Sequence, residues 1–404
     1  SAGTLARPLK TLTSIKAQYL LAFGTLGSLL PFLSVYLEAR GLTKPQIGDV
    51  FGISSAAVIF TPVVITFLAD AHVSSRKLLL GIYTLSAVLL AVVMRVEGFA
   101  AILFFYCLYS LAFSPMIAVQ DGLNFSIQRA RAAMGLREAP YHVVRVWGSV
   151  GYILPGVVLF VLLRYGAHVN AVPATAIAFC LVGAINTAKL PDPRAVLAAT
   201  GRSRLPTLGA LRAMLEAHVL IFCIAMWLIH VAIIGFYGFY PLYLTQTIGI
   251  DRQWVGLIAS VGVVIEIGYM LSFGILQRRI GFRGLMLLGF SLTAVRFWMM
   301  AAYPNLGVAV GTQIVHGLMA LVVHVAPPIF LNHHADESYR SSMQGLYAML
   351  VMGTGRLVGG MISGRLAAFG VIDMFYINAA VCMVAVLLIL LALTVFLVYG
   401  LIAS

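Results

Sequence analysis

Charged residues are scarce in this sequence. Only 10% of its 404 residues are Asp, Glu, Lys or Arg, 61% are hydrophobic, and the mean hydropathy is +1.01. A water-soluble protein of this length needs a charged surface that this composition does not supply. Apolar runs of about 20 residues, the length that crosses a bilayer as a helix, recur along the chain. The sequence therefore predicts an all-α integral membrane protein, because a β-barrel would show short alternating strands instead.

Cysteine is also rare. The four cysteines lie far apart inside apolar runs, which excludes a disulfide framework and offers no metal-ligand spacing. The sequence contains no nucleophile–base pair, phosphate-binding loop or soluble sensory segment, so we predict neither an enzyme nor a bound cofactor or metal. Loop charges account for the formal net charge of +13, and we predict no nucleic-acid binding.

The apolar runs predict twelve transmembrane helices. A polar stretch with three prolines, 189–216, separates the first six from the last six. We therefore predict two pseudo-symmetric six-helix bundles, 1–188 and 217–404, joined by a cytoplasmic linker. The predicted helices cover residues 16–37, 46–69, 77–95, 99–127, 141–163, 171–188, 217–244, 253–276, 285–302, 306–331, 342–367 and 372–401.

Lysine and arginine are concentrated in alternate loops. The loops on the side of the N-terminus, together with the linker, carry most of them, and such an excess marks the cytoplasmic side. Both termini are therefore predicted to be cytoplasmic, in a multi-pass protein of a bacterial-type inner membrane. We expect a monomer whose partners are a small-molecule solute and membrane lipid.

Short motifs recur about half the chain length apart. Glycines bracket the segment 41–48 and, with the same spacing, the segment 249–256, while Arg145 and Arg356 each open an Arg-x-x-Gly motif. Two charged hairpins also correspond, with Asp70 in the first and Gln277 at the equivalent position of the second. Several matches near one offset predict a duplicated six-helix unit.

The first hairpin resembles the signature loop of the major facilitator superfamily, Gly-x-x-x-Asp-Arg-x-Gly-Arg-Arg/Lys. Thr66, Ala71 and Ser75 replace three residues of that signature. The resemblance implies the major facilitator fold, in which this loop holds cytoplasmic helix ends together and does not touch the solute. Simple positive-inside topology also explains the basic residues, but it does not explain the acid. The predicted cytoplasmic gate consists of Asp70, Arg76, Lys77 and Arg283.

A second motif narrows the resemblance. The segment 141–151 reads Tyr-His-Val-Val-Arg-Val-Trp-Gly-Ser-Val-Gly, which is similar to Tyr-Gly-x-x-Arg-x-Trp-Gly-Ser-x-Gly of the phenylpropionate permease-like family. His142 replaces the glycine of that motif. The family is related to lactose permease, and the resemblance covers essentially the whole chain. It implies secondary active transport by alternating access.

Ionisable side chains inside the predicted helices are functional candidates, because each costs at least ~2.5 kcal/mol to keep in the membrane. Asp121 shares a helix face with Asn124, and it is either a structural partner of Arg145 or a contact for solute or proton. Glu266 lies in a strongly apolar stretch, where desolvation favours a neutral, proton-carrying acid. Its alternative role is to neutralise a buried arginine.

The resemblance to lactose permease implies that Arg296 and His316 belong to a proton-coupling network. Met319 stands where that network has a glutamate, so the scheme does not transfer whole. A membrane histidine also often serves only as hydrogen-bonded packing. We predict that the coupling ion is H⁺, with Na⁺ left open, and that it is handled by Glu266, Asp121, His316 and Arg296.

The predicted solute site combines cations with aromatic rings. Three buried arginines against two buried acids favour an anionic or carbonyl-rich solute. The predicted solute-binding residues are Arg145, Asn124, Arg356, His324, Tyr269, Trp227, Tyr237 and Tyr347. The leading hypothesis is proton-coupled symport of a small organic solute, such as an aromatic carboxylate. The alternatives are a proton-coupled antiporter that exports amphipathic compounds, and a nucleoside or oligosaccharide symporter.

Overall fold

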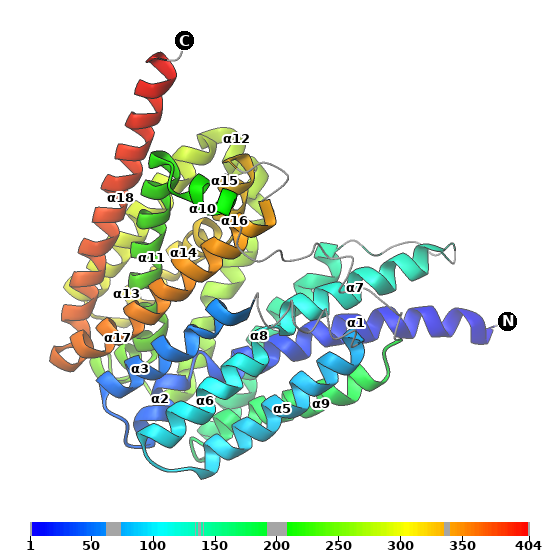
Figure 1. Cartoon of the computed structure of the whole chain (residues 1–404). Coiled ribbons are helices and arrows are strands. Elements are labelled where there is room, and N and C mark those ends of the chain that lie inside the picture. Colours follow the sequence, from blue (N-terminus) through cyan, green and yellow to red (C-terminus); the bar gives the residue numbers. More distant parts are fainter. Residues whose placement is uncertain are drawn as a thin grey trace. The chain divides into compact units, whose positions relative to one another are not determined.

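The computed structural model describes residues 2–61, 74–133, 135, 139, 141–191, 208–334 and 340–402, and Figure 1 shows its course. Every regular element in these residues is a helix, which confirms the predicted all-α class. Within them, nine helices are long and apolar enough to cross a membrane, or ten if a pair bent by 45° forms one span. The number twelve stays a prediction, because the second predicted span is described only to residue 61 and two later spans run together.

The helices form two compact units. Unit 1 comprises Ser1–Arg40, Thr61–Arg202 and Gln253–Ser260. In it, α1 packs along α8 and α9, and α5 packs on α6 and α9. Its helices are α1 (Ala2–Leu29), α2 (Leu33–Ala39), α5 (Ser75–Arg95), α6 (Phe99–Phe113), α7 (Met116–Ala133), α8 (Tyr141–Arg164) and α9 (Ala171–Ala188).

Unit 2 comprises Gly41–Phe60, Ser203–Arg252 and Val261–Ser404. In it, α11 packs on α17 and α18, and α3 lies along α17. Its elements are α3 (Lys44–Ser55), α10 (Leu208–Met214), α11 (Ala217–Leu242), η1 (Tyr243–Thr247), most of α12 (Val255–Ala302), α13 (Leu306–Gly311), α14 (Gln313–Ala320), η3 (Leu321–Val325), α15 (Ala326–His334), α16 (Arg340–Leu346), η4 (Tyr347–Gly353), α17 (Thr354–Phe369) and α18 (Val371–Ile402). A short 3₁₀ turn, η2 (Arg252–Trp254), precedes α12.

Proline and glycine set the breaks between helices. The bend between α1 and α2 contains Pro31, whose missing N–H and ring interrupt a helix. The two spans predicted at 253–276 and 285–302 are continuous as α12 except at Gly281, where φ is +70°. The turn between these two spans is therefore limited to Gly281 and is shorter than the charged hairpin that the sequence shows there. Gly41 and Gly249, matched in the sequence repeat, also share a left-handed conformation, with φ of +82° and +84°.

Among the described residues, three π-helical turns lie in membrane spans of unit 2. η1 ends the span that begins with α11, η3 carries His324, and η4 begins at Tyr347. Pro327 follows η3 and cannot donate the hydrogen bond that an α-helix needs there, so the turn widens. Such wide turns are frequent at functional sites. They give these two side chains directions that a regular helix would not.

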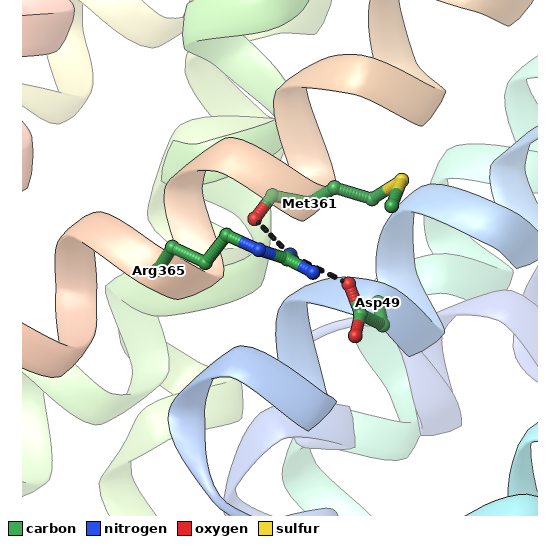
Figure 2. Close-up of polar contacts among 3 residues, drawn as sticks. All are labelled: Asp49, Met361 and Arg365. Atoms are coloured by element: carbon green, nitrogen blue, oxygen red, sulfur yellow. Dashed lines mark hydrogen bonds and ion pairs between the residues drawn. The ribbon is translucent and has the colours of Figure 1, made fainter.

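A glycine seam joins α3 to α17 within unit 2. A Cβ atom on Gly48 would lie 2.5 Å from the carbonyl oxygen of Gly360 and 2.5 Å from the Cα atom of Gly364. The two helix backbones are therefore in direct contact, as small residues permit. Beside the seam, Arg365 Nη1 donates to Asp49 Oδ1 at 2.8 Å and to the carbonyl oxygen of Met361 at 2.7 Å (Figure 2).

Candidate functional site

Asp121 is the centre of a polar cluster in unit 1. Its Oδ1 accepts hydrogen bonds from the hydroxyl groups of Tyr19 on α1, at 2.5 Å, and Tyr141 on α8, at 3.1 Å. Tyr141 also stacks on Phe125, with ring centroids 5.4 Å apart. The three helices α1, α7 and α8 therefore meet at one half-buried carboxylate.

Arg145 lies in the same cluster without forming an ion pair to Asp121 in the described part of the chain. Its guanidinium is placed over the ring of Phe23, 4.0 Å from the centroid, and it acts on Asp121 electrostatically through space. A positive charge over an aromatic face is attracted by the ring quadrupole. The structure thus brings the predicted residues Asp121 and Arg145 together and leaves the guanidinium half-exposed.

Further along α7, buried amides have unused hydrogen-bonding groups. Asn124 is 2% exposed, and within the described residues its Oδ1 and both side-chain polar atoms of Gln120 have no hydrogen-bond partner. Gln128, one turn beyond Asn124, accepts from the backbone N–H of Ala139 through its Oε1 at 3.2 Å. Buried amides are normally satisfied by protein or water, so this face of α7 is suited to a polar ligand.

Only part of the predicted gate falls in the described residues, and Asp70 lies outside them. Arg76 donates to the carbonyl oxygen of Leu190, just beyond α9, at 3.0 Å, so it connects two helices of unit 1. Lys77 is exposed, and its backbone N–H bonds the N-cap hydroxyl of Ser74 at 3.3 Å. Arg283 is exposed after the break in α12. The gate role of these four residues remains a prediction.

A chain of hydrogen bonds runs through the core of unit 2. Arg296 Nη2 donates to Gln313 Oε1 at 3.1 Å, Gln313 Nε2 donates to the Tyr240 hydroxyl at 2.9 Å, and that hydroxyl donates to the carbonyl oxygen of Ala309 at 2.9 Å. Arg296 is completely buried, with the ring of Phe236 4.2 Å from its guanidinium carbon. Helices α11, α12 and α14 are thus held together by neutral acceptors around one cation.

His316 lies beside this chain. Its ring contacts Tyr237 edge-on at 5.8 Å between centroids, and its Nδ1 has no hydrogen-bond partner in the part of the chain that the structure describes. Glu266 approaches from α12, because a Cβ atom on Gly317 would lie 2.8 Å from its backbone nitrogen, and Tyr269 also borders that glycine. Glu266 and Tyr237 interact electrostatically. The structure therefore gathers the predicted coupling residues of unit 2 into one region.

His230, Tyr347 and Trp227 make a second group in unit 2. Both ring nitrogens of His230 and the hydroxyl of Tyr347 are buried and have no hydrogen-bond partner in the described part of the chain, and the two rings are 6.5 Å apart. Trp227 Nε1 donates to the hydroxyl of Thr354 at 2.9 Å. Arg356 acts electrostatically on His230.

His324, in η3, is exposed, although it belongs to a membrane helix. Arg356 also acts electrostatically on this histidine. In the part of the chain that the structure describes, no three His, Cys, Asp or Glu side chains lie close enough to hold a metal ion.

The sequence by itself does not mark several of these residues as members of a site. Tyr19 and Gln120 have no distinctive spacing, and their role depends on which helices meet. The phenol of Tyr141 was visible only as part of a family motif. The π-helical turns that hold His324 and Tyr347 have one sequence signal, the Pro327-Pro328 pair after η3.

Known proteins resemble this chain over most of its length. The model of the MFS_1 like family matches residues 12–378. Nucleoside permease NupG of Escherichia coli (strain K12) is 22% identical over 357 residues, covering 84% of this chain and 82% of the permease. The "Probable 3-phenylpropionic acid transporter" of the same strain is 26% identical over 378 residues, covering 92% and 95%. The crystal structure of nucleoside transporter NupG matches with a TM-score of 0.82 at 19% identity, covering 95% and 99%.

Proposed function

The chain belongs to the MFS_1 like family and is a membrane transporter rather than an enzyme, and from this premise we propose that it is a proton-coupled symporter for nucleosides. The match confirms the resemblance to the major facilitator superfamily and its fold. The solute, the coupling ion and the direction of transport are our proposal.

The observation that carries the proposal is the group formed by His230 and Tyr347. Three of its buried polar atoms, two ring nitrogens and one hydroxyl, have no hydrogen-bond partner among the described residues, and a buried polar group without a partner costs about 1–3 kcal/mol. His230 lies beside the indole of Trp227, since a Cβ atom on Gly355 would be 3.0 Å from His230 Cβ and 3.4 Å from Trp227 Cδ1. A planar, neutral solute with several donors and acceptors, such as a nucleoside, matches this chemistry.

The exposure of neighbouring side chains supports a water-filled path at this group. His324 is exposed, and Arg356 and Trp227 are half-buried on membrane helices. An ionisable side chain in the membrane faces protein or water rather than lipid. NupG, one of the relatives, is named a nucleoside permease, which agrees with this choice of solute.

Coupling is proposed to use Glu266, which lies beside Gly317 and interacts with Tyr237. One proton crossing ~100 mV supplies about 2.3 kcal/mol, which supports a solute gradient of well over tenfold. Asp121 is the candidate acid of unit 1, and the hydroxyl groups of Tyr19 and Tyr141 fix its carboxylate by hydrogen bonds, so we assign it to positioning the cluster.

An aromatic carboxylate is the second candidate solute. The observation that favours it is Arg296, a fully buried cation whose hydrogen-bond acceptor is a neutral amide. A relative named for 3-phenylpropionic acid agrees with this candidate. Export of amphipathic compounds has no such observation in its favour.

The experiment is uptake into proteoliposomes with an imposed inward proton gradient. Labelled uridine should accumulate above its equilibrium level, and unlabelled nucleosides should compete more strongly than 3-phenylpropionate. His230→Phe keeps a ring of similar size and removes both nitrogens, so uridine affinity should fall about tenfold or more. The matched control is His168→Phe, at an exposed position. Saturable phenylpropionate uptake that nucleosides leave unchanged would contradict the choice of solute.

A further inference from the structure

Arg296 is a buried cation whose hydrogen-bonding capacity is largely unused. Its side chain is 0% exposed, and among the residues that the structure describes only Nη2 has a hydrogen-bond partner, the amide oxygen of Gln313 at 3.1 Å. Nε and Nη1 have none. A guanidinium carries five N–H donors and stays protonated in proteins. The side chain therefore needs further acceptors.

Within the described residues, Arg296 has no carboxylate in direct contact, and Glu266, the acid of this region, acts electrostatically on the neighbouring phenol of Tyr237. The electrostatic partners of Arg296 are the phenols of Tyr240 and Tyr237. The ring of Phe236 covers one face of the guanidinium at 4.2 Å. A single cation–π contact is weaker than the penalty for burying an ion, so the ring does not offset that penalty.

His316 adds a second unused group to the same place. Its Nδ1 has no partner, and its ring lies 5.9 Å from Phe236, the ring that covers Arg296. Gly262 holds α12 close to this histidine and to Gln313, because a Cβ atom there would lie 2.8 Å from the His316 ring and 2.7 Å from Gln313 Oε1. Close packing therefore fixes the positions of the nitrogens that have no partner.

We propose that Arg296 is a binding site for a small monovalent anion, with His316 as its neighbour. An anion in contact with the guanidinium supplies a negative charge directly beside Arg296, and its lone pairs accept from Nε and Nη1. The bound group must be compact, carry one negative charge and accept hydrogen bonds. It is either the carboxylate of a transported solute or a free inorganic ion such as chloride. The site does not depend on nucleosides being the solute, because it is defined by buried N–H groups of a cation that a neutral solute leaves without a charged acceptor.

The test measures binding to the purified full-length protein and not transport, so it is independent of the uptake experiment. Thermal unfolding is followed while sodium chloride, or sodium 3-phenylpropionate, replaces sodium isethionate, a bulkier sulfonate, at constant ionic strength. A ligand that binds only the folded state raises the unfolding temperature with its concentration. Stabilisation by chloride assigns an inorganic ion, and stabilisation by 3-phenylpropionate alone assigns a solute carboxylate. No stabilisation by either anion overturns the proposal.

Two variants locate the effect. Arg296→Gln should weaken the apparent affinity about tenfold to a hundredfold, the range expected from losing charge-assisted hydrogen bonds. The control Arg278→Gln removes an equal charge from an exposed position and should respond as the wild type does. An unchanged response in Arg296→Gln overturns the proposal.

Gln313→Glu is the decisive variant if Arg296→Gln does not fold. The new carboxylate takes the place of the amide oxygen 3.1 Å from Arg296 Nη2 and supplies a negative charge from within the chain. It should unfold at a higher temperature than the wild type in isethionate and lose the response to both anions. A retained anion response in this variant overturns the proposal.

Discussion

Replacing Gly360 by alanine tests the glycine seam between α3 and α17. The added Cβ would lie 2.5 Å from the Cα atom of Gly52 and 2.9 Å from the carbonyl oxygen of Gly48. Carbon atoms in contact are normally ~3.5–4.0 Å apart, so the two helices must separate by about 1 Å. The neighbours are backbone atoms that cannot rotate away, which puts the cost toward the upper part of the ~1–3 kcal/mol typical of overpacking.

The same substitution elsewhere provides the control. A Cβ atom on Gly81, in α5, would meet no other atom within 4 Å, so Gly81→Ala gains only the higher helix propensity of alanine, up to ~1 kcal/mol. The difference between the two variants therefore isolates the packing cost of the seam.

The assay is thermal unfolding of the purified full-length variants in one detergent. Gly360→Ala should unfold several degrees below the wild type, and Gly81→Ala at or above it. If Gly360→Ala is as stable as Gly81→Ala, the close approach of α3 and α17 is not part of the stable structure and the reasoning fails.

Two other substitutions test the coupling acid and a helix cap. Glu266→Gln should abolish uptake driven by a proton gradient while leaving solute counterflow. Glu97→Gln, at an exposed acid, is its control. Undiminished proton-driven accumulation in Glu266→Gln would refute the assignment. Arg40→Gln should lower the free energy of unfolding by about 1–3 kcal/mol, because Arg40 Nη1 donates to the Met94 carbonyl oxygen at 3.2 Å and Nη2 to that of Val96 at 2.5 Å, at the end of α5. Thermal unfolding equal to that of the wild type would exclude this capping role.

The sequence predicts which residues belong to the candidate site, but not which side chains contact one another there. Asp121, Glu266, Arg296 and His316 were found from sequence because a polar residue inside an apolar run is rare and costly. Their partners were not, since the phenol of Tyr19 reaches Asp121 from a helix 102 positions away. The predicted substrate and coupling assignments therefore remain proposals that rest on contacts, and the gate residue Asp70 lies outside the described residues.

The sequence by itself determined that this chain is a helical membrane transporter of the major facilitator type. Hydropathy and the excess of basic residues in alternate loops depend on neighbouring residues, and the repeated motifs depend on a fixed offset along the chain. All three can therefore be recognised without knowing the fold. Only the tertiary structure decided that Arg296 is bound to a neutral amide, that His230 and Tyr347 keep unused polar atoms, and that α3 touches α17 through glycine. These features depend on which helix faces meet at distances of a few ångströms, and helical periodicity gives the faces but not their neighbours.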